Sequence, residues 1–373
     1  MSVPRLPPEL VDLVLGHLQP PDDSETLRAS TLVCSEWFPI ARQHLFFVVH
    51  IREDESHNDS PRFLHVVRSS PGIGMVVKDL RVIGPPRLRI ISFDVIFTLL
   101  RELPRLQHLV LYRMTIPPYL GENVPQFFLR TLTLRTVRDE RDKGRRCSTI
   151  LPFLDLFNVE QLNLLSVLWL NPTIARPHEI VSPTHIPPTF KASRVKLSFS
   201  VALGLDFLRH SANLSALTEL DINTHNIHSL TSLGPLVGDH RCDIRTLKLR
   251  FTEISSPSRE RPINFQDLVQ QHLLLPLRAF RSLKSFHLAI YGLSNASAFW
   301  EVFPAFFEVL PTTLVEFHLY CPSSPFPVGI PQFDQLVHSY TNLTDIYVHS
   351  PCSEAMEKDV RCSQSGKTFH CVD

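Results

Sequence analysis

One pattern of apolar positions recurs along most of the chain: an apolar residue, two polar ones, then apolar, polar, apolar. The first two copies are Val77–Val82 and Leu106–Leu111, and successive copies begin 23 to 39 residues apart. Apolar and polar positions that alternate are typical of a strand with one buried face. The pattern therefore predicts ten short strands. They are Val77–Val82, Leu106–Leu111, Leu129–Leu134, Val159–Leu164, Ala192–Leu197, Leu217–Ile222, Ile244–Leu249, Leu283–Leu288, Leu314–Leu319 and Leu343–Val348.

Apolar stretches with helical spacing lie between these strands. We expect helices at Phe63–Arg68, Phe93–Leu103, Ile150–Phe157, Leu203–His210, Phe265–Phe280, Phe299–Leu310 and Phe333–Tyr340. A helix followed by a strand about every 30 residues predicts an α/β repeat. Since one such unit cannot bury its own apolar face, neighbouring units have to stack against one another.

The N-terminal segment has a different pattern. Leu10, Val14 and Leu18 recur every four residues, as on one stripe of a helix, and the prolines at 7 and 8 suit its first turn. A Pro/Asp break follows, and then a second helix predicted to end near Val33 and a third from Trp37. Three helices this short and this apolar cannot cover all their apolar surface on each other.

Two motifs in this segment resemble an F-box. They are Leu6-Pro7-Pro8-Glu9-Leu10 and Val33-Cys34-Ser35-Glu36-Trp37. The resemblance implies docking onto the Skp-type linker of a cullin–RING ubiquitin ligase, with seven residues at the docking surface or in its supporting core: Leu6, Pro7, Leu10, Val14, Leu18, Val33 and Trp37. The alternative is a small helical core closed by Trp37.

The repeats that follow resemble an irregular leucine-rich repeat, as in F-box proteins of the fungal type. The fold class expected is thus α/β: a three-helix F-box and then a solenoid with a parallel sheet on its concave face and helices outside. The Asn or Cys that usually follows such a repeat strand is mostly missing. The predicted divisions are a helical module (1–51), a linker (52–60), the solenoid (61–350), and a polar tail or cap without a repeat strand (351–373).

The polar positions of each predicted strand should face outwards on the concave side. Towards the C-terminus these positions hold His, Tyr and basic residues, of which Tyr and Arg are enriched at protein interfaces. The candidates for binding a substrate protein are Lys248, Arg250, His287, His318, Tyr320, Tyr347 and His349. The alternative is a solvated sheet face with no partner.

Composition argues against nucleic acid or a membrane as the main partner. The chain has 37 Lys and Arg against 37 Asp and Glu, so it lacks the basic excess that nucleic acid or an anionic membrane demands of a partner. No signal peptide and no long apolar run are apparent, which predicts a cytoplasmic or nuclear protein with reduced cysteines.

No candidate catalytic, cofactor or metal site emerges. Motifs for nucleophilic, phosphate-binding and metal chemistry are missing. Cys352, Cys362, His370 and Cys371 are separated by 10, 8 and 1 residues, unlike the short pairs of a zinc site. Together with the F-box resemblance, which implies an adaptor that brings a protein substrate to the ligase core, this leads us to expect a non-enzymatic protein. The alternatives are a repeat scaffold with no ligase role and an enzyme with convergent titratable groups at the strand ends.

Overall fold

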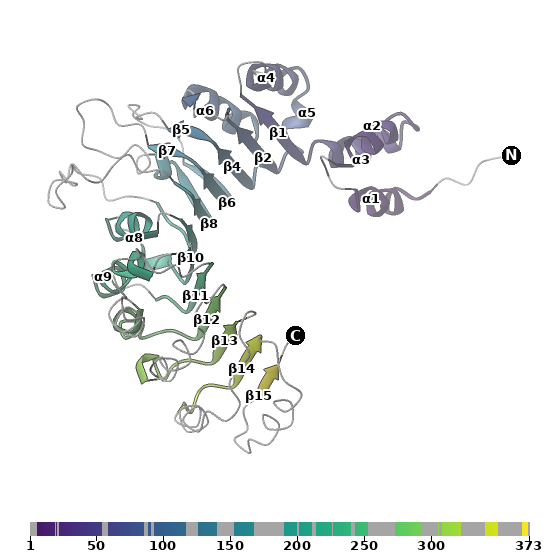
Figure 1. Ribbon diagram of the computed structural model, residues 1–373. Coiled ribbons are helices and arrows are strands. Elements are labelled where there is room, and N and C mark those ends of the chain that lie inside the picture. Colours follow the sequence, from purple (N-terminus) through teal and green to yellow (C-terminus); the bar gives the residue numbers. More distant parts are fainter. Residues whose placement is uncertain are drawn as a thin grey trace, which may run out of the picture. The chain divides into compact units, whose positions relative to one another are not determined.

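The computed structural model describes parts of the chain between residues 6 and 371, with the helices and strands that Figure 1 shows. The described residues are 6–18, 20, 22–53, 59–85, 89–90, 93–116, 126–139, 153–167, 190–199, 201–210, 214–225, 227–239, 243–252, 273–291, 305, 308–321, 340–349 and 368–371. They fall into two compact units, the first up to Asn158 and the second from Val159.

The first unit begins with three helices, α1 (Pro8–Gly16), α2 (Ser24–Ser30) and α3 (Trp37–Leu45). Pro39 lies in the first turn of α3, where its missing N–H leaves no helical bond unmade. The second helix ends three residues earlier than predicted, at Ser30 instead of Val33. The chain then enters strand β1 (Val48–Arg52), so the range predicted for the helical module, 1–51, includes all but the last residue of the first strand of the sheet.

The rest of the first unit alternates helices and parallel strands. The helices are α4 (Asp59–Ser69), α5 (Pro71–Gly74) and α6 (Phe93–Glu102). The strands β2 (Asp79–Ile83), β4 (His108–Tyr112) and β6 (Phe127–Arg135) follow β1 in the order β1-β2-β4-β6. A small second sheet contains β3 (Arg89–Ile90), β5 (Met114–Ile116) and β7 (Arg138–Asp139).

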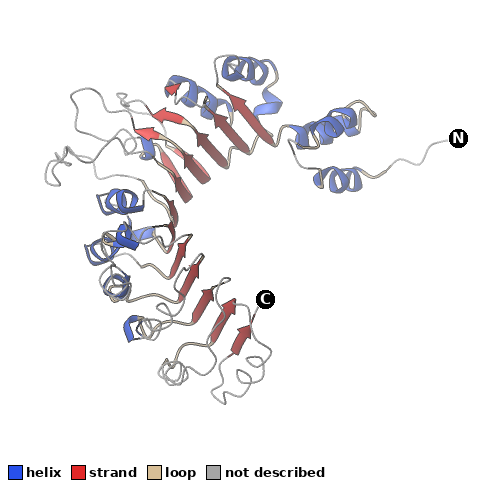
Figure 2. Cartoon of the chain, in the orientation of Figure 1, coloured by secondary structure: helices blue, strands red, loops and turns tan. Residues whose placement is uncertain are grey.

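The second unit has one parallel sheet in strand order. It comprises β8 (Phe157–Leu165), β9 (Arg194–Ser198), β10 (Glu219–Thr224), β11 (Thr246–Phe251), β12 (Ser285–Ile290), β13 (Glu316–Tyr320), β14 (Asp345–His349) and β15 (Thr368–Cys371). Its helices are α8 (Val201–His210), the 3-10 turns η2 (Leu214–Ala216) and η3 (Ile227–Leu230), α9 (Leu233–Asp239) and α11 (Leu275–Leu277). Helix α8 packs against β9 and β10, and Figure 2 shows the helices on one side of the sheet.

All ten predicted strands are confirmed, and eight of them begin two residues later than predicted. The first apolar residue of each of these eight copies, such as Leu283 or Leu314, is buried in the turn before the strand. Apolar positions then point into the core, which for β12 and β13 includes Phe286 and Phe317 with ring centroids 5.8 Å apart. The intervening positions lie on the opposite face and are mostly half-buried or exposed.

The predictions for the helices and for the C-terminal tail are only partly confirmed. The helices at 63–68, 93–103 and 203–210 are confirmed by α4, α6 and α8. The prediction for 150–157 is wrong at its end, because Phe157 begins β8, and most of 299–310 and 333–340 lies outside the described residues. The tail was expected to lack a repeat strand, and this too is wrong: β15 pairs in parallel with β14.

A left-handed residue follows four successive strands. Arg113, Thr136, Ser166 and Phe199 have φ between 52° and 69°. The N–H of Arg113 donates to the carbonyl of Arg135 at 3.0 Å, and that of Ser166 to the carbonyl of Ser198 at 3.1 Å. At these two turns the backbone hydrogen bonds between neighbouring repeats therefore continue past the end of the strand.

Candidate functional site

The three N-terminal helices enclose a small core. Four residues are fully buried in it, and four more are packed around them. The buried ones are Val11, Leu15, Leu27 and Ala41, and the partly buried ones are Leu18, Trp37, Ile40 and Leu45. His44 Nε2 and Asp12 Oδ1 lie 2.7 Å apart and link α3 to α1.

The seven residues predicted for linker docking divide into two groups. Leu18 and Trp37 pack against the helical core and so support the module. The other five are exposed: Leu6, Pro7, Leu10, Val14 and Val33. Leu10 is 47% exposed, Val14 57% and Val33 61%, although all three are apolar.

The sequence pattern did not identify all of the core residues or all of the exposed apolar residues of the helical module. The core stripe of α1 is Val11 and Leu15, each 2% exposed, which lies one residue along from the predicted stripe. Further apolar side chains, Leu13, Leu32 and Phe38, are exposed as well. Two adjacent rows of α1 are apolar, so the spacing alone could not decide which row faces inwards.

The second candidate surface is the outward face of strands β10 to β14. Parallel pairing places Asp221, Lys248, His287, His318 and Tyr347 side by side in one row. A second row, two residues further along each strand, contains Asn223, Arg250, Ala289, Tyr320 and His349. All seven residues predicted for substrate binding therefore share one face.

Rings in the first row form a continuous stack. His287 and His318 are parallel with centroids 4.0 Å apart, and His318 and Tyr347 follow at 4.2 Å. In the second row the rings tilt: Tyr320 lies 5.5 Å from His349 in the same row, and 5.3 Å from Tyr291, which follows β12. Such offset or tilted pairs are attractive beyond the area they bury.

Burial keeps the stacked imidazoles neutral. It is the largest cause that lowers the pKa of His287 to about 3, and the neighbouring His318, Lys248 and Arg250 act in the same direction. Burial also lowers the pKa of His318, against an opposing effect of Glu316. At neutral pH this part of the face is thus aromatic and uncharged.

The basic residues of the face are held by carboxylates of the preceding strand. Lys248 Nζ donates to Glu219 Oε1 at 2.6 Å, and Arg250 donates to Asp221 Oδ2 at 3.1 Å. Lys196 Nζ approaches Asp221 from the other side at 3.8 Å. Both cations of β11 therefore lean towards β10 and away from the rings of β13.

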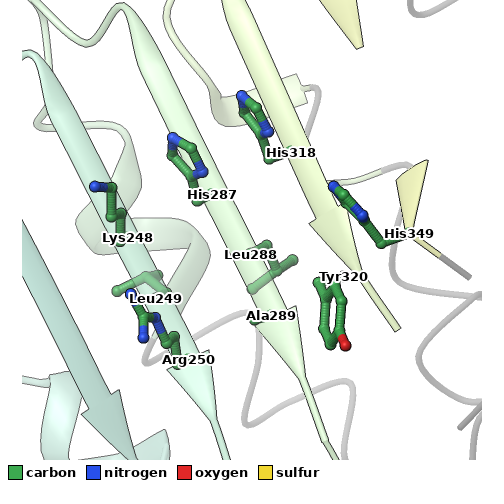
Figure 3. A pocket seen from close by; sticks show the side chains of 9 residues that line it. All are labelled: Lys248, Leu249, Arg250, His287, Leu288, Ala289, His318, Tyr320 and His349. Atoms are coloured by element: carbon green, nitrogen blue, oxygen red, sulfur yellow. The ribbon is translucent and has the colours of Figure 1, made fainter. Parts of the chain in front are cut away.

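An open groove of about 300 Å³ lies between these two groups (Figure 3). Six of the seven predicted substrate-binding residues line it, together with three that were not predicted. The lining residues are Lys248, Leu249, Arg250, His287, Leu288, Ala289, His318, Tyr320 and His349. Tyr347, the seventh, contacts the groove through its stack on His318.

Other sites are not apparent in the described part of the chain. It holds no group of three or more His, Cys, Asp or Glu residues suited to a metal ion. The tail cysteines 352 and 362 lie outside the described residues. Among the helices that are described, none has the length and apolar character to span a membrane.

Comparison with known proteins adds no relative. No family model matches the chain, and no curated protein matches it in sequence.

Proposed function

We propose that this chain is a substrate-recognition adaptor of an SCF-type cullin–RING ubiquitin ligase. Its N-terminal helices are an F-box that docks on the Skp-type linker, and the repeats are an irregular leucine-rich-repeat solenoid whose sheet face holds a protein substrate. The adaptor performs no chemistry itself, because holding a substrate near the ubiquitin-charged enzyme raises the effective concentration of the reacting groups.

The observation that carries this proposal is the apolar surplus of the helical module. Among the described residues of the module four apolar side chains form the buried core, whereas Leu10, Val14 and Val33 are about half exposed or more. Burying apolar surface contributes roughly 25 cal/mol per Å², so leaving several such side chains in water forgoes stabilisation that a partner would supply. Leu10 and Val33 lie within the two F-box-like motifs, and Val14 lies one helical turn after Leu10.

The groove supports binding rather than catalysis. Ser285 Oγ lies 2.9 Å from His287 Nε2, the spacing of a nucleophile and its base, but it also donates to Glu316 Oε2 at 3.1 Å. Since a hydroxyl has one hydrogen, a serine that donates to Glu316 receives Nε2–H from the neutral His287, and this tautomer does not act as the serine's base. In a catalytic triad the carboxylate lies behind the imidazole, whereas here it is bonded to the hydroxyl.

The test of the proposal is binding of the full-length chain to a purified Skp-type linker. The double substitution Leu10→Asp/Val14→Asp places two carboxylates on the exposed stripe without touching Val11 or Leu15, so binding should be lost while the helices stay folded. Val66→Asp is the matched control, because Val66 is an exposed apolar residue of helix α4. It should bind like the unmodified chain.

Trp37→Ala is a poorer probe, because Trp37 packs against the core of the module. Its loss would unfold the helices, so a loss of linker binding could not be assigned to the docking surface. Failure of the unmodified chain to bind the linker, or equal binding by the double variant, would refute the adaptor role. That result would leave the alternative, a leucine-rich-repeat interaction scaffold without a ligase role.

A further inference from the structure

One position in the groove differs from its neighbours. In the second outward row, long or planar side chains stand on β11, β13 and β14, as Arg250, Tyr320 and His349. The position between the first two, on β12, is Ala289. Ala289 lines the groove, and because its side chain is only a methyl group, part of the groove lies above it (Figure 3).

The space above Ala289 has the dimensions of one planar group. Parallel strands lie about 4.8 Å apart, so Arg250 and Tyr320 are separated by roughly 9.6 Å across β12. The adjacent row shows what this spacing allows, since His287, His318 and Tyr347 stand on consecutive strands as stacked rings 4.0 and 4.2 Å apart. A ring above Ala289 would likewise stand one strand away from the residue on each side.

Contacts with neighbouring residues hold the side chains on both sides of this space. Asp221 accepts a hydrogen bond from Arg250 at 3.1 Å and draws the guanidinium towards β10. Tyr320 contacts His349 on β14, and it also contacts Tyr291, two residues after Ala289. The side chains beside the space are therefore held in place without a ligand by contacts that do not involve Ala289.

The charges around the space define its occupant. A guanidinium on one wall attracts the electron-rich face of an aromatic ring, and a tyrosine on the other stacks on it. Lys248 and Arg250 are already paired with Glu219 and Asp221, so they are poor partners for a run of phosphates. This favours an uncharged ring on a peptide over a nucleic acid.

We propose that the groove is a subsite for a single aromatic side chain of a bound protein, inserted above Ala289 between Arg250 and Tyr320. The inference rests on the proposed role of this sheet face in holding a substrate, and it adds the class of residue that is recognised. Ala289 acts here as the floor of the subsite because its methyl group leaves room for the incoming ring.

The test uses N-acetyl-tryptophanamide as the probe and N-acetyl-leucinamide as the aliphatic control. The full chain is labelled with ¹³C on its alanine methyl groups, and the Ala289 signal is assigned from its loss in Ala289→Gly. The aromatic probe should move the Ala289 signal upfield by its ring current, and the Ala279 signal should stay in place. No movement, or equal movement with the leucine probe, would overturn the proposal.

Substitutions at Ala289 test the same subsite through the affinity for the aromatic probe. Ala289→Phe fills the space from within and should weaken binding of the aromatic probe by roughly tenfold, the value of one aromatic contact of about 1.4 kcal/mol. Ala29→Phe, at an exposed position of α2, is the matched control and should bind like the unmodified chain. If Ala289→Phe does not fold, Ala289→Leu serves the same purpose.

Two further outcomes separate this inference from the adaptor role. A chain that binds the Skp-type linker but not the aromatic probe refutes the subsite alone, whereas the reverse result refutes only the ligase role. Saturable binding of a 12-nucleotide single-stranded RNA that competes with the probe would overturn the assignment to a peptide side chain.

Discussion

The imidazole rings of His287 and His318 lie face to face, with centroids 4.0 Å apart and planes inclined by 10°. Protonating both would place two positive charges in contact within a row that already has Lys248 beside it. The stack therefore requires neutral rings, and its geometry links this part of the face to pH.

The first prediction is a loss of stability on acidification. The folded-state pKa of His287, about 3, lies below its unfolded value of 6.5, so the unfolded chain binds more protons between these two values. The contribution of this residue is complete above pH 6.5 and declines as the pH falls towards 3. Because the ring is partly exposed, we expect His287→Phe to remove about 1 kcal/mol of the decline in unfolding free energy between pH 7 and 5.

The measurement is urea denaturation at a series of pH values. His287→Phe keeps a ring in the stack but cannot titrate, so its profile should be flatter. His65→Phe removes an exposed histidine of α4 and should retain the original slope. Identical slopes in all three proteins would contradict the prediction.

A second prediction distinguishes the two apolar rows of α1. Leu15→Ala deletes a side chain that is 2% exposed and should cost about 2–5 kcal/mol of the local stability of helices α1 to α3. Leu13→Ala changes a side chain that is 62% exposed and should cost little. Amide hydrogen exchange of the three helices measures both effects, and similar exchange in the two variants would show the core to be misassigned.

A third prediction concerns the left-handed turn after β6. Thr136 has φ of 52°, a conformation that is costly for a β-branched residue and free of strain for glycine. Thr136→Gly should stabilise the chain by about 0.5–1 kcal/mol, because relieved strain outweighs the added flexibility of the unfolded chain.

The control for this prediction is Thr133→Gly, three residues earlier inside β6, where glycine should destabilise by a similar amount. The opposite kind of change, Gly84→Ala, should lower the stability of the fold, since a Cβ at this position would overlap the carbonyl oxygen of Arg113. Thermal and urea unfolding of the three variants measure the signs. A destabilised Thr136→Gly would show that the turn carries no strain.

A fourth prediction compares two free thiols. Cys34 is exposed, whereas Cys321 is buried at 1% exposure and its pKa is raised to about 12 by desolvation. Since the thiolate is the reactive form, iodoacetamide at pH 8 should modify Cys34 and spare Cys321 until denaturant is added. Mass spectrometry of the peptides measures this order, and equal rates at both positions would contradict it.

The strands were predictable because their signal is strong and local. In copies such as Leu314–Leu319 three apolar residues have to face one core, and only a strand preceded by a turn satisfies that spacing. The register of parallel neighbours then follows, which explains why Lys248, His287 and His318 could be placed on one face. The contacts among them, including the ring stack, depend on side-chain conformations that spacing does not encode.

Other features lacked such a signal. Helix α9 contains Gly234, Pro235 and Gly238, residues that argue against a helix by local propensity and are overridden by the buried Leu233 and Leu236. Strand β15 is four residues long and lies in a polar tail. The role of Ala289 was also invisible, because a small residue becomes meaningful only when the side chains on either side are known.

Strand β15 has a consequence for how the protein behaves at high concentration. It is the last strand in the described order, and it pairs with β14 along Asp345–Val348. Without it, the backbone donors and acceptors on that side of β14 would offer a template to strands of other copies. Deleting Thr368–Cys371 should therefore promote self-association of the chain. With β15 in place, the strand at this edge has four residues, one fewer than β14, so it offers fewer backbone groups to another copy.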